Sequence, residues 1–385
     1  MKRKTSSLLF CLIVLIFAIC NVGYDMVYAD VANQNNFRYK SKILIEANSG
    51  KVLDENNADE KLPIASIVKL MTLYITFEAL DNGSINEDNL MQVSEYSASM
   101  GGSQLFLDAN TEHKVCDLIK SIVIASANDS AVVLAENLAG SEENFVAKMN
   151  EKAVELNLAS THYVDCTGLN EDGYSTARDV ASLSRLVLTN PHYLKYSQIW
   201  LDSYVHPSGR ETELANTNKL LRKYNYCIAG KTGTTEKAGY CYTSLCDNNG
   251  FKLIAVVLGA DSTNDRFDII KETMQTGYAN YKFTLKYCCG DFYQEIEIPK
   301  SKQKVVKLYL ANDLGAVENK NSTSDFEETI KLNDNSLPIK AGAVIGELCL
   351  IDENGEVVAR ADLVVNESVE KAGYFDNIET IINNW

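Results

Sequence analysis

Ser66 and Lys69 carry side chains that can perform acyl transfer together. They stand three residues apart, and residues at this spacing share one face of a helix, with their Cβ atoms about 5–6 Å apart. An amine at that distance can take the proton of a hydroxyl group and make its oxygen nucleophilic. Lys69 lies inside an apolar run, where burial lowers the pKa of an ammonium group towards neutrality. The pair predicts a serine nucleophile with a lysine base. Taken alone, however, this spacing more often belongs to a helix serine followed by a solvated lysine that has no catalytic role.

Two further short motifs follow in chain order. Ser126-Ala-Asn128 interrupts a strongly apolar segment, and Lys231-Thr-Gly233-Thr234 follows about one hundred residues later. Taken singly, the first could be only a helix cap and the second only an exposed strand lysine with a turn. The three motif types in this order are typical of class A β-lactamases and penicillin-binding proteins. Together they favour a serine acyl-transfer enzyme over chance.

The likeness extends beyond these motifs. The sequence resembles the low-molecular-mass penicillin-binding proteins that act as D-alanyl-D-alanine carboxypeptidases, from about residue 39 to 366. This resemblance implies an α/β (α+β) fold: a penicillin-binding/β-lactamase-like domain with a central, mostly antiparallel sheet flanked by helices and a helical subdomain, followed by a small all-β domain. The segments that carry it are 65–72, 102–107, 125–130, 145–150, 230–234 and 238–241.

The resemblance implies catalytic roles for three residues. Ser66 would attack the carbonyl between the two terminal D-alanines of a peptidoglycan stem peptide, and Lys69 would accept its proton. Ser126 would relay a proton to the departing amine. Water would then hydrolyse the acyl-enzyme, although an amine acceptor could compete with it. A β-lactam mimics the same peptide, so covalent inhibition is expected. No cofactor is implied.

Further residues would bind the substrate. The backbone N–H groups of Ser66 and Thr234 would form an oxyanion hole, in which one donor is worth about 3 kcal/mol of barrier. Lys231 would attract the terminal carboxylate and keep the neighbouring lysine deprotonated. The residues implied in substrate binding are Asn128, Lys231, Thr232, Gly233, Thr234 and Arg266.

Carboxylate recognition has an alternative reading at one residue and a departure from the family pattern at another. For Arg266 a surface salt bridge is the alternative to carboxylate binding. Relatives often carry an arginine where Thr217 stands, so this chain departs from the family pattern beside the expected carboxylate site.

Hydrophobic periodicity and turn residues predict the elements that position these groups. A strand, a turn and a return strand precede a helix that starts near Pro63 and ends at Asp81. A corner between two helices is expected at residues 126–130. The predicted elements are strands at 42–47 and 52–53, an extended piece at 105–107, helices within 115–139 and at 142–158 and 176–188, a doubly covered strand at 252–258, and a helix from 265 to about 286.

The C-terminal part has a different pattern. Four segments alternate apolar and polar residues at period two, which predicts a β-sandwich domain over residues 288–366. Residues 367–385 read as an amphipathic helix, with Phe375, Ile378, Ile381, Ile382 and Trp385 on one face. Peripheral membrane contact through this helix and docking on its own β domain are both open, because its acidic residues gain nothing from anionic lipid. The predicted strands are 295–298, 305–310, 328–332 and 356–365.

The N-terminus predicts export. Residues 1–29 combine a basic start, a 13-residue apolar stretch and a small-residue cleavage site, as signal peptides do. Residues 30–287 would form the peptidase domain, acting outside the cytoplasm, in the cell wall or at the outer face of the membrane. The whole chain has a net charge of −16 and lacks a basic cluster beyond the signal, which argues against nucleic acid as a partner.

Cysteine and histidine usage adds two expectations. Eight cysteines remain after the signal, at irregular spacings and without a C-x-x-C motif. A chain with this much core does not need a disulfide framework, so free and mostly buried thiols are favoured. The four histidines are scattered, and a metal site is not expected.

Two rival functions can be weighed against the carboxypeptidase. A class A-like β-lactamase needs a loop glutamate, usually in a Glu-x-x-x-Asn context, and residues 129–228 contain no such spacing. It would also be a single mature domain. A catalytically silent wall-binding scaffold would be expected to lack Ser66 or Lys69, and both are present.

Overall fold

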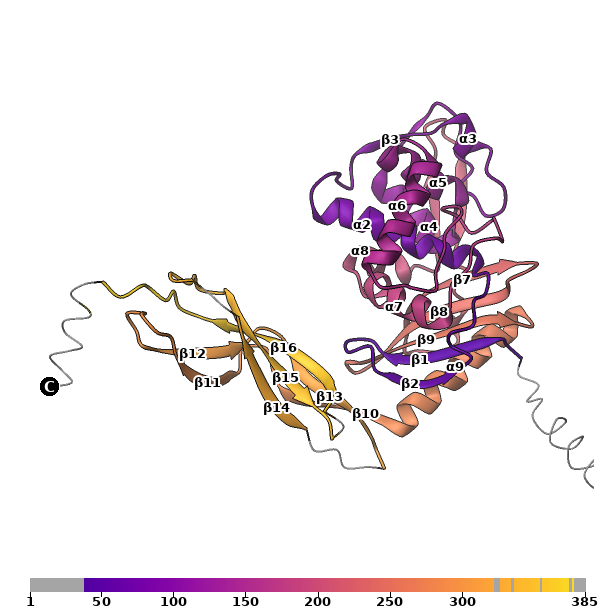
Figure 1. Ribbon diagram of the computed structural model, residues 1–385. Helices are drawn as coiled ribbons and strands as arrows, with labels where there is room; N and C mark the ends of the chain where they lie inside the picture. The colour runs from indigo at the N-terminus through magenta and orange to yellow at the C-terminus, as the bar shows by residue number, and fades with distance from the viewer. Residues whose placement is uncertain (1–37, 322–325, 334–335, 354, 374–375, 377–385) are drawn as a thin grey trace, which may run out of the picture. The chain divides into compact units, whose positions relative to one another are not determined.

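A five-stranded antiparallel sheet is the centre of the larger part of the fold (Figure 1). The computed structural model describes residues 38–321, 326–333, 336–353, 355–373 and 376. The strand order is β2-β1-β9-β8-β7, which leaves β7 at one edge. The strands are β1 (Ser41–Glu46), β2 (Val52–Asn56), β7 (Cys227–Thr235), β8 (Gly239–Asn248) and β9 (Phe251–Ala260).

Both faces of this sheet are covered, as the apolar run at 252–258 predicts. Successive side chains of a strand point to opposite faces. In β9, Ile254 and Val256 enter the core beneath the helical subdomain, whereas Ala255 and Val257 enter a second core. Phe267 of helix α9 (Thr263–Asn280) lies in that second core. Figure 1 shows α9 and the helical subdomain on opposite faces of the sheet.

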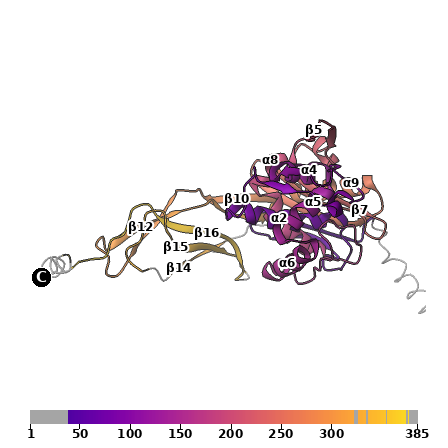
Figure 2. The same ribbon diagram turned by 90° about the horizontal axis from the view of Figure 1, so that it is seen from above.

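The helical subdomain contains the buried helix α2. The predicted corner at 126–130 is confirmed: α4 ends at Ala125, Ser126 takes a left-handed conformation, and α5 begins at Asn128. Thr176 caps α7, its hydroxyl accepting a hydrogen bond from the Asp179 N–H. Figure 2 shows these helices from above. They are α2 (Lys69–Asp81), α3 (Glu95–Ala98), α4 (Val115–Ala125), α5 (Asn128–Ala139), α6 (Glu142–Glu155), α7 (Ala177–Leu188) and α8 (Pro191–Ser197).

Shorter elements complete this region. Residues 105–107, predicted as extended, lie outside the described strands, and Phe106 has a positive φ of 62°. The Asp129 carboxylate binds the N–H groups of Leu105 at 2.9 Å and Leu107 at 3.1 Å, which fixes this loop. The shorter elements are the pair β3 (Leu90–Gln92) and β4 (Glu112–Lys114), the pair β5 (Leu201–Val205) and β6 (Glu211–Ala215), and the 3₁₀ turn η2 (Lys219–Arg222).

The prediction of one helix from 265 to about 286 is wrong at its C-terminal end. Helix α9 stops at Asn280, and β10 (Tyr281–Tyr287) follows directly. The residues of β10 alternate between half-buried and exposed over most of its length, and β10 pairs with β13 (Leu314–Asn319). Apolar and polar residues alternate over residues 281–287, which is the period of a strand and not of a helix, so the helix prediction overlooked a local signal here.

The remaining strands form a β module around a separate core that includes Leu308, Leu348 and Leu363. All four predicted C-terminal strands are present, but β10, β13 and β15 were not predicted. Five strands make one antiparallel sheet, in the order β11-β12-β16-β15-β14. They are β11 (Phe292–Glu297), β12 (Val305–Leu310), β14 (Glu327–Leu332), β15 (Val344–Ile351) and β16 (Val357–Val365).

The predicted terminal helix does not start at residue 367. Val369 forms an isolated bridge with Ile339, and Lys371 forms one with Ser301. The apolar positions Phe375, Ile378, Ile381, Ile382 and Trp385 lie outside the described residues. Within the described ranges, no helix combines the length and the apolar character needed to span a bilayer.

Candidate active site

Ser66 lies in a tight turn rather than in a regular α-helix. The 3₁₀ turn η1 (Ala65–Val68) leads into α2, so the predicted helix begins later than Pro63. Ala65 has a positive φ of 49°, which is uncommon for a residue with a side chain. Such strain persists only where surrounding structure fixes it, and here the turn at residues 64–66 is packed against two glycines. The Ser66 side chain is half-buried and reaches the surface.

Gly168 and Gly233 provide the space beside this turn. A Cβ atom on Gly168 would lie 2.0 Å from the carbonyl oxygen of Ala65. A Cβ atom on Gly233 would lie 3.1 Å from the Ser66 nitrogen. Glycine lets two backbones approach this closely. The β7 strand is thereby held against the residue that carries the hydroxyl group.

Lys69, the residue that the spacing predicts to be the base, lies against Ser66. Its Nζ atom lies 3.0 Å from Ser66 Oγ and donates to the carbonyl of Thr167 at 2.7 Å. The side chain is fully buried, with 0% of its surface exposed. Burial lowers the pKa of Lys69 to about 8, and the nearby Cys166, Asp165 and Asp129 oppose this shift. An amine with this pKa is partly neutral near pH 7 and can accept a proton.

The segment 165–168 belongs to the site and was missed in the sequence. The Thr167 carbonyl accepts from Lys69, and the Cys166 carbonyl accepts from Thr72 Oγ1 at 2.7 Å. Both contacts use backbone oxygens, so the side-chain types give no direct signal. A glycine with a positive φ of 81° at Gly168 is the one local sign of a close approach, and many glycines in the chain share it.

Ser126 and Asn128 flank the corner between α4 and α5. Ser126 is 5% exposed, with φ and ψ of 64° and 34°. The amide of Asn128 donates to the Gly101 carbonyl at 2.7 Å, while its Oδ1 atom is buried and has no hydrogen-bond partner among the described residues. An unsatisfied buried oxygen is costly unless a partner arrives. Asn128 therefore offers an acceptor to an N–H group of a ligand.

Lys231 connects the edge strand β7 to this corner. Its Nζ atom donates to Ser126 Oγ at 2.6 Å and to the Thr232 carbonyl at 3.0 Å. The side chain is 1% exposed. Burial, followed by the charges of Lys69 and Arg266, lowers the pKa of Lys231. A bound carboxylate would reverse that shift, because an opposite charge favours the protonated form.

The residues after Lys231 present hydroxyl groups along β7. Thr232 Oγ1 donates to Thr217 Oγ1 at 2.9 Å, so Thr217 contacts the predicted carboxylate site. Thr234 is exposed, and its hydroxyl donates to the Gly233 carbonyl at 2.8 Å. Because β7 is an edge strand, its outer side is available to an extended peptide.

Arg266 is buried, which contradicts the alternative of a surface salt bridge. It is 7% exposed and projects from the first turn of α9. Its Nη1 atom lies 3.0 Å from the Gly233 carbonyl oxygen and 2.9 Å from Thr234 Oγ1. The guanidinium group therefore supports the β7 backbone where the oxyanion hole is expected.

The structure thus brings eight of the nine predicted site residues to one region between the helical subdomain and the edge of the sheet, and the ninth, Arg266, contacts β7 from helix α9. No group of three histidine, cysteine or acidic side chains within the described ranges could hold a metal ion. The eight cysteines that follow the predicted signal are free thiols, and Cys166 is buried beside Lys69.

This arrangement defines the class of protein. An antiparallel sheet with α9 on one face and a helical subdomain on the other is the fold of penicillin-binding proteins and β-lactamases, here followed by a β module. Penicillin-binding protein 5 from Haemophilus influenzae has this fold, with a TM-score of 0.68, 28% identity, and coverage of 87% of this chain and 98% of that one. A peptidoglycan synthesis regulatory factor (PBP3) from Streptococcus pneumoniae gives a TM-score of 0.73 at 28% identity, covering 86% and 99%.

The chain belongs to the Peptidase S11 family of D-alanyl-D-alanine carboxypeptidases. Residues 29–262 match that family, and residues 284–371 match the family described as penicillin-binding protein 5, C-terminal domain. The chain is 34% identical to D-alanyl-D-alanine carboxypeptidase DacF of Bacillus subtilis, covering 100% of this chain and 99% of DacF. It is 31% identical to DacC of Escherichia coli, covering 87% and 85%. It is a serine-type carboxypeptidase that acts on peptidoglycan and binds β-lactams, as is typical of this family.

Proposed function

We propose that Ser66 is the nucleophile of this carboxypeptidase and that Lys69 is its base. The observation that carries the proposal is the 3.0 Å contact between Ser66 Oγ and the buried Nζ atom of Lys69. The lowered pKa of Lys69, about 8, supports the same roles. The substrate is a peptidoglycan stem peptide that ends in D-Ala-D-Ala.

The reaction proceeds through an acyl-enzyme. Ser66 Oγ bonds to the carbonyl carbon of the penultimate D-alanine as its proton passes to Lys69. The C–N bond to the terminal D-alanine then breaks, and the departing amine takes the proton from Lys69, relayed through Ser126. Water attacks the ester, the shortened peptide leaves, and Ser66 regains its proton. The 2.6 Å contact between Ser126 and Lys231 supports a proton relay at this corner.

The substrate is held by the remaining site residues. Lys231 and Thr232 bind the terminal carboxylate, and Asn128 accepts from the substrate amide through its unsatisfied oxygen. Gly233 allows the close approach of backbone. The N–H groups of Ser66 and Thr234 hold the oxyanion. Arg266 contributes to the carboxylate site by hydrogen-bonding the Gly233 carbonyl and the Thr234 hydroxyl of β7.

Labelling with a fluorescent penicillin, followed by an assay of D-alanine release, tests this function. The wild-type protein should form a stable adduct and release D-alanine from a pentapeptide, whereas Ser66→Ala should do neither. Rapid turnover of the antibiotic would favour the β-lactamase alternative. A protein that neither binds penicillin nor releases D-alanine would favour the scaffold alternative.

We further propose how the chain is divided and where it acts. Residues 1–29 are a signal peptide that exports the protein, and the peptidase domain starts at residue 30. The pairing of β10 with β13 supports a boundary just before Tyr281, seven residues earlier than the predicted position. Peripheral membrane contact through residues 374–385 remains part of this proposal. N-terminal sequencing of the secreted protein and vesicle flotation of chains with and without those residues test both points.

A further inference from the structure

We propose that Asp165 is a positioning residue for Lys69, which it serves by folding residues 165–170 so that the Thr167 carbonyl faces the Nζ atom. This inference rests on the proposed role of Lys69 as the base. Neither the three motifs nor the sequence-based assignment of substrate-binding residues includes Asp165.

The Asp165 carboxylate organises the segment by accepting four hydrogen bonds. Its Oδ2 atom accepts from Thr167 Oγ1 at 2.7 Å, the Leu169 N–H at 2.8 Å and the Asn170 N–H at 3.2 Å. Its Oδ1 atom accepts from the Gly168 N–H at 2.9 Å. Three successive backbone N–H groups therefore turn towards one side chain. An aspartate can bond nearby backbone groups in this way and so fix a turn.

This turn determines where the Thr167 carbonyl points. Thr167 is buried, and its hydroxyl is occupied by Asp165 while its carbonyl accepts from Lys69 at 2.7 Å. The next residue, Gly168, packs against the Ala65 carbonyl beside the nucleophile. The segment thus contacts both members of the Ser66–Lys69 pair through its backbone.

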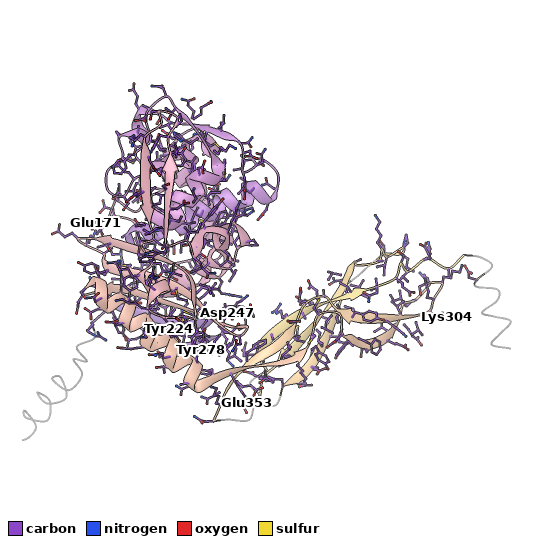
Figure 3. All side chains as sticks on the ribbon, turned by 180° about the vertical axis from the view of Figure 1, so that it is seen from behind. Glu171, Tyr224, Asp247, Tyr278, Lys304 and Glu353 are labelled. Carbon is purple, nitrogen blue, oxygen red and sulfur yellow. The ribbon has the colours of Figure 1, made fainter. Side chains whose placement is uncertain are left out.

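The far end of the loop is anchored as well. Glu171 accepts from the Lys237 N–H at 2.7 Å, and the Lys237 ammonium donates to the Glu171 carbonyl at 3.1 Å. Figure 3 shows Glu171 at one end of the sheet, where the turn between β7 and β8 lies. With one end fixed to the sheet and the other folded on Asp165, the loop has little freedom to withdraw from Lys69.

Asp165 also acts on Lys69 through its charge. The charges that oppose the effect of burial on the pKa of Lys69 come from Cys166, Asp165 and Asp129, and Lys231 lies on the other side of the site. Removing the Asp165 charge should therefore lower the pKa of Lys69 further. A residue that merely stabilised the loop would leave the pH dependence of the base unchanged.

The variant that separates these effects is Asp165→Asn, because its amide keeps the shape but offers one acceptor oxygen and no charge. The measurement is the acylation rate with a chromogenic cephalosporin between pH 6 and 10. The matched control is Asp172→Asn, which removes an exposed carboxylate from the same loop. We expect Asp165→Asn to slow acylation at least tenfold at the pH optimum. The midpoint of the rise in acylation rate with pH should also lie at a lower pH than in the wild-type protein. Asp172→Asn should stay within twofold of wild type.

A second variant keeps the inference falsifiable if Asp165→Asn does not fold. Thr167→Val removes one of the four donors to Asp165 and retains the Thr167 carbonyl, so it should slow acylation about two- to fivefold. A folded Asp165→Asn protein with the wild-type rate and pH profile would overturn the inference, and so would an unchanged Thr167→Val rate. If Ser66→Ala were still labelled by penicillin, the proposed function itself would fail, which is a distinct result.

Discussion

Lys231 donates a 2.6 Å hydrogen bond to the hydroxyl of Ser126, and both side chains are buried. One residue comes from the edge strand of the sheet and the other from the corner between α4 and α5. The contact joins the two halves of the site. In the proposed reaction, the hydroxyl group held by this contact relays a proton to the departing amine.

Ser126→Ala should therefore impair proton transfer more than binding. We expect a decrease of about 10²–10³-fold in kcat with little change in KM, which is within the usual contribution of a positioned acid or base. Steady-state release of D-alanine from a pentapeptide provides the measurement.

Ser130→Ala is the matched control, because Ser130 lies one turn away in α5 and bonds Ser121 rather than a site residue. It should keep kcat within about twofold. A Ser126→Ala enzyme with the wild-type kcat would contradict the relay.

The lowered pKa of Lys69 predicts how acylation depends on pH. The base works when neutral, so the rate should rise with pH and level off above the pKa, which is about 8. Stopped-flow acylation with a chromogenic β-lactam between pH 6 and 10 measures this limb. Lys69→Arg should abolish it, because a guanidinium group stays protonated over this range. A pH-independent wild-type rate would show that Lys69 is not the base.

The residues proposed to carry out the chemistry could be singled out from the sequence because the proposed reaction sets their identities and spacings. Ser66 and Lys69 need a single turn between them, and the largely apolar run around Lys69 in the sequence already indicates a lowered pKa. The corner at Ser126 follows from polar residues in an apolar segment. Each of these signals is local and lies in the side chains.

The missed parts depend on backbone groups and on distant partners. Thr167 contributes a carbonyl, which any residue could supply, and Asp165 works by binding N–H groups of its own loop. Strand β10 is stabilised by pairing with β13, about thirty residues later, and the alternation of its residues was a local sign that the helix prediction overlooked. The burial of Arg266 follows from the packing of α9 under the sheet, and its position at a helix start gives no sign of it.

Two buried histidines predict a stability that depends on pH. His113 bonds Tyr204 at 2.5 Å and Thr111 at 2.8 Å, and His206 bonds Thr212 at 2.8 Å. Burial is the main cause that lowers the pKa of both imidazoles. The folded state therefore binds protons less readily than the unfolded chain, whose histidines titrate near pH 6.5. The contribution of these groups to stability is fully present above that pH and is lost as the pH falls below it.

Urea unfolding at pH 7.5 and pH 5.5 tests this expectation. The wild-type protein should have a smaller unfolding free energy at pH 5.5 than at pH 7.5. In His113→Gln this difference should be smaller by up to about 1 kcal/mol, since one pKa unit corresponds to about 1.4 kcal/mol. His162→Gln is the control, because His162 is exposed. An unchanged pH dependence in the His113 variant would contradict the assignment.

The close approach of Gly168 to the nucleophile's turn gives the last prediction. Gly168 has a φ of 81°, and a Cβ atom there would lie 2.0 Å from the Ala65 carbonyl oxygen. Gly140 has almost the same φ, 82°, with nothing within 4 Å of its would-be Cβ atom. Gly140→Ala should therefore lose about 1–2 kcal/mol of unfolding free energy because of its left-handed backbone alone, and its acylation rate should not change.

Gly168→Ala should lose the same unfolding free energy, and its new Cβ atom must also displace the turn that carries Ser66. We therefore expect the acylation rate to fall at least 10²-fold, which is the scale of a 1 Å misplacement. The comparison with Gly140→Ala removes the cost of the left-handed backbone, which both variants share. If both variants acylate at the wild-type rate, the packing of residues 165–168 against Ala65 does not position the Ser66 hydroxyl.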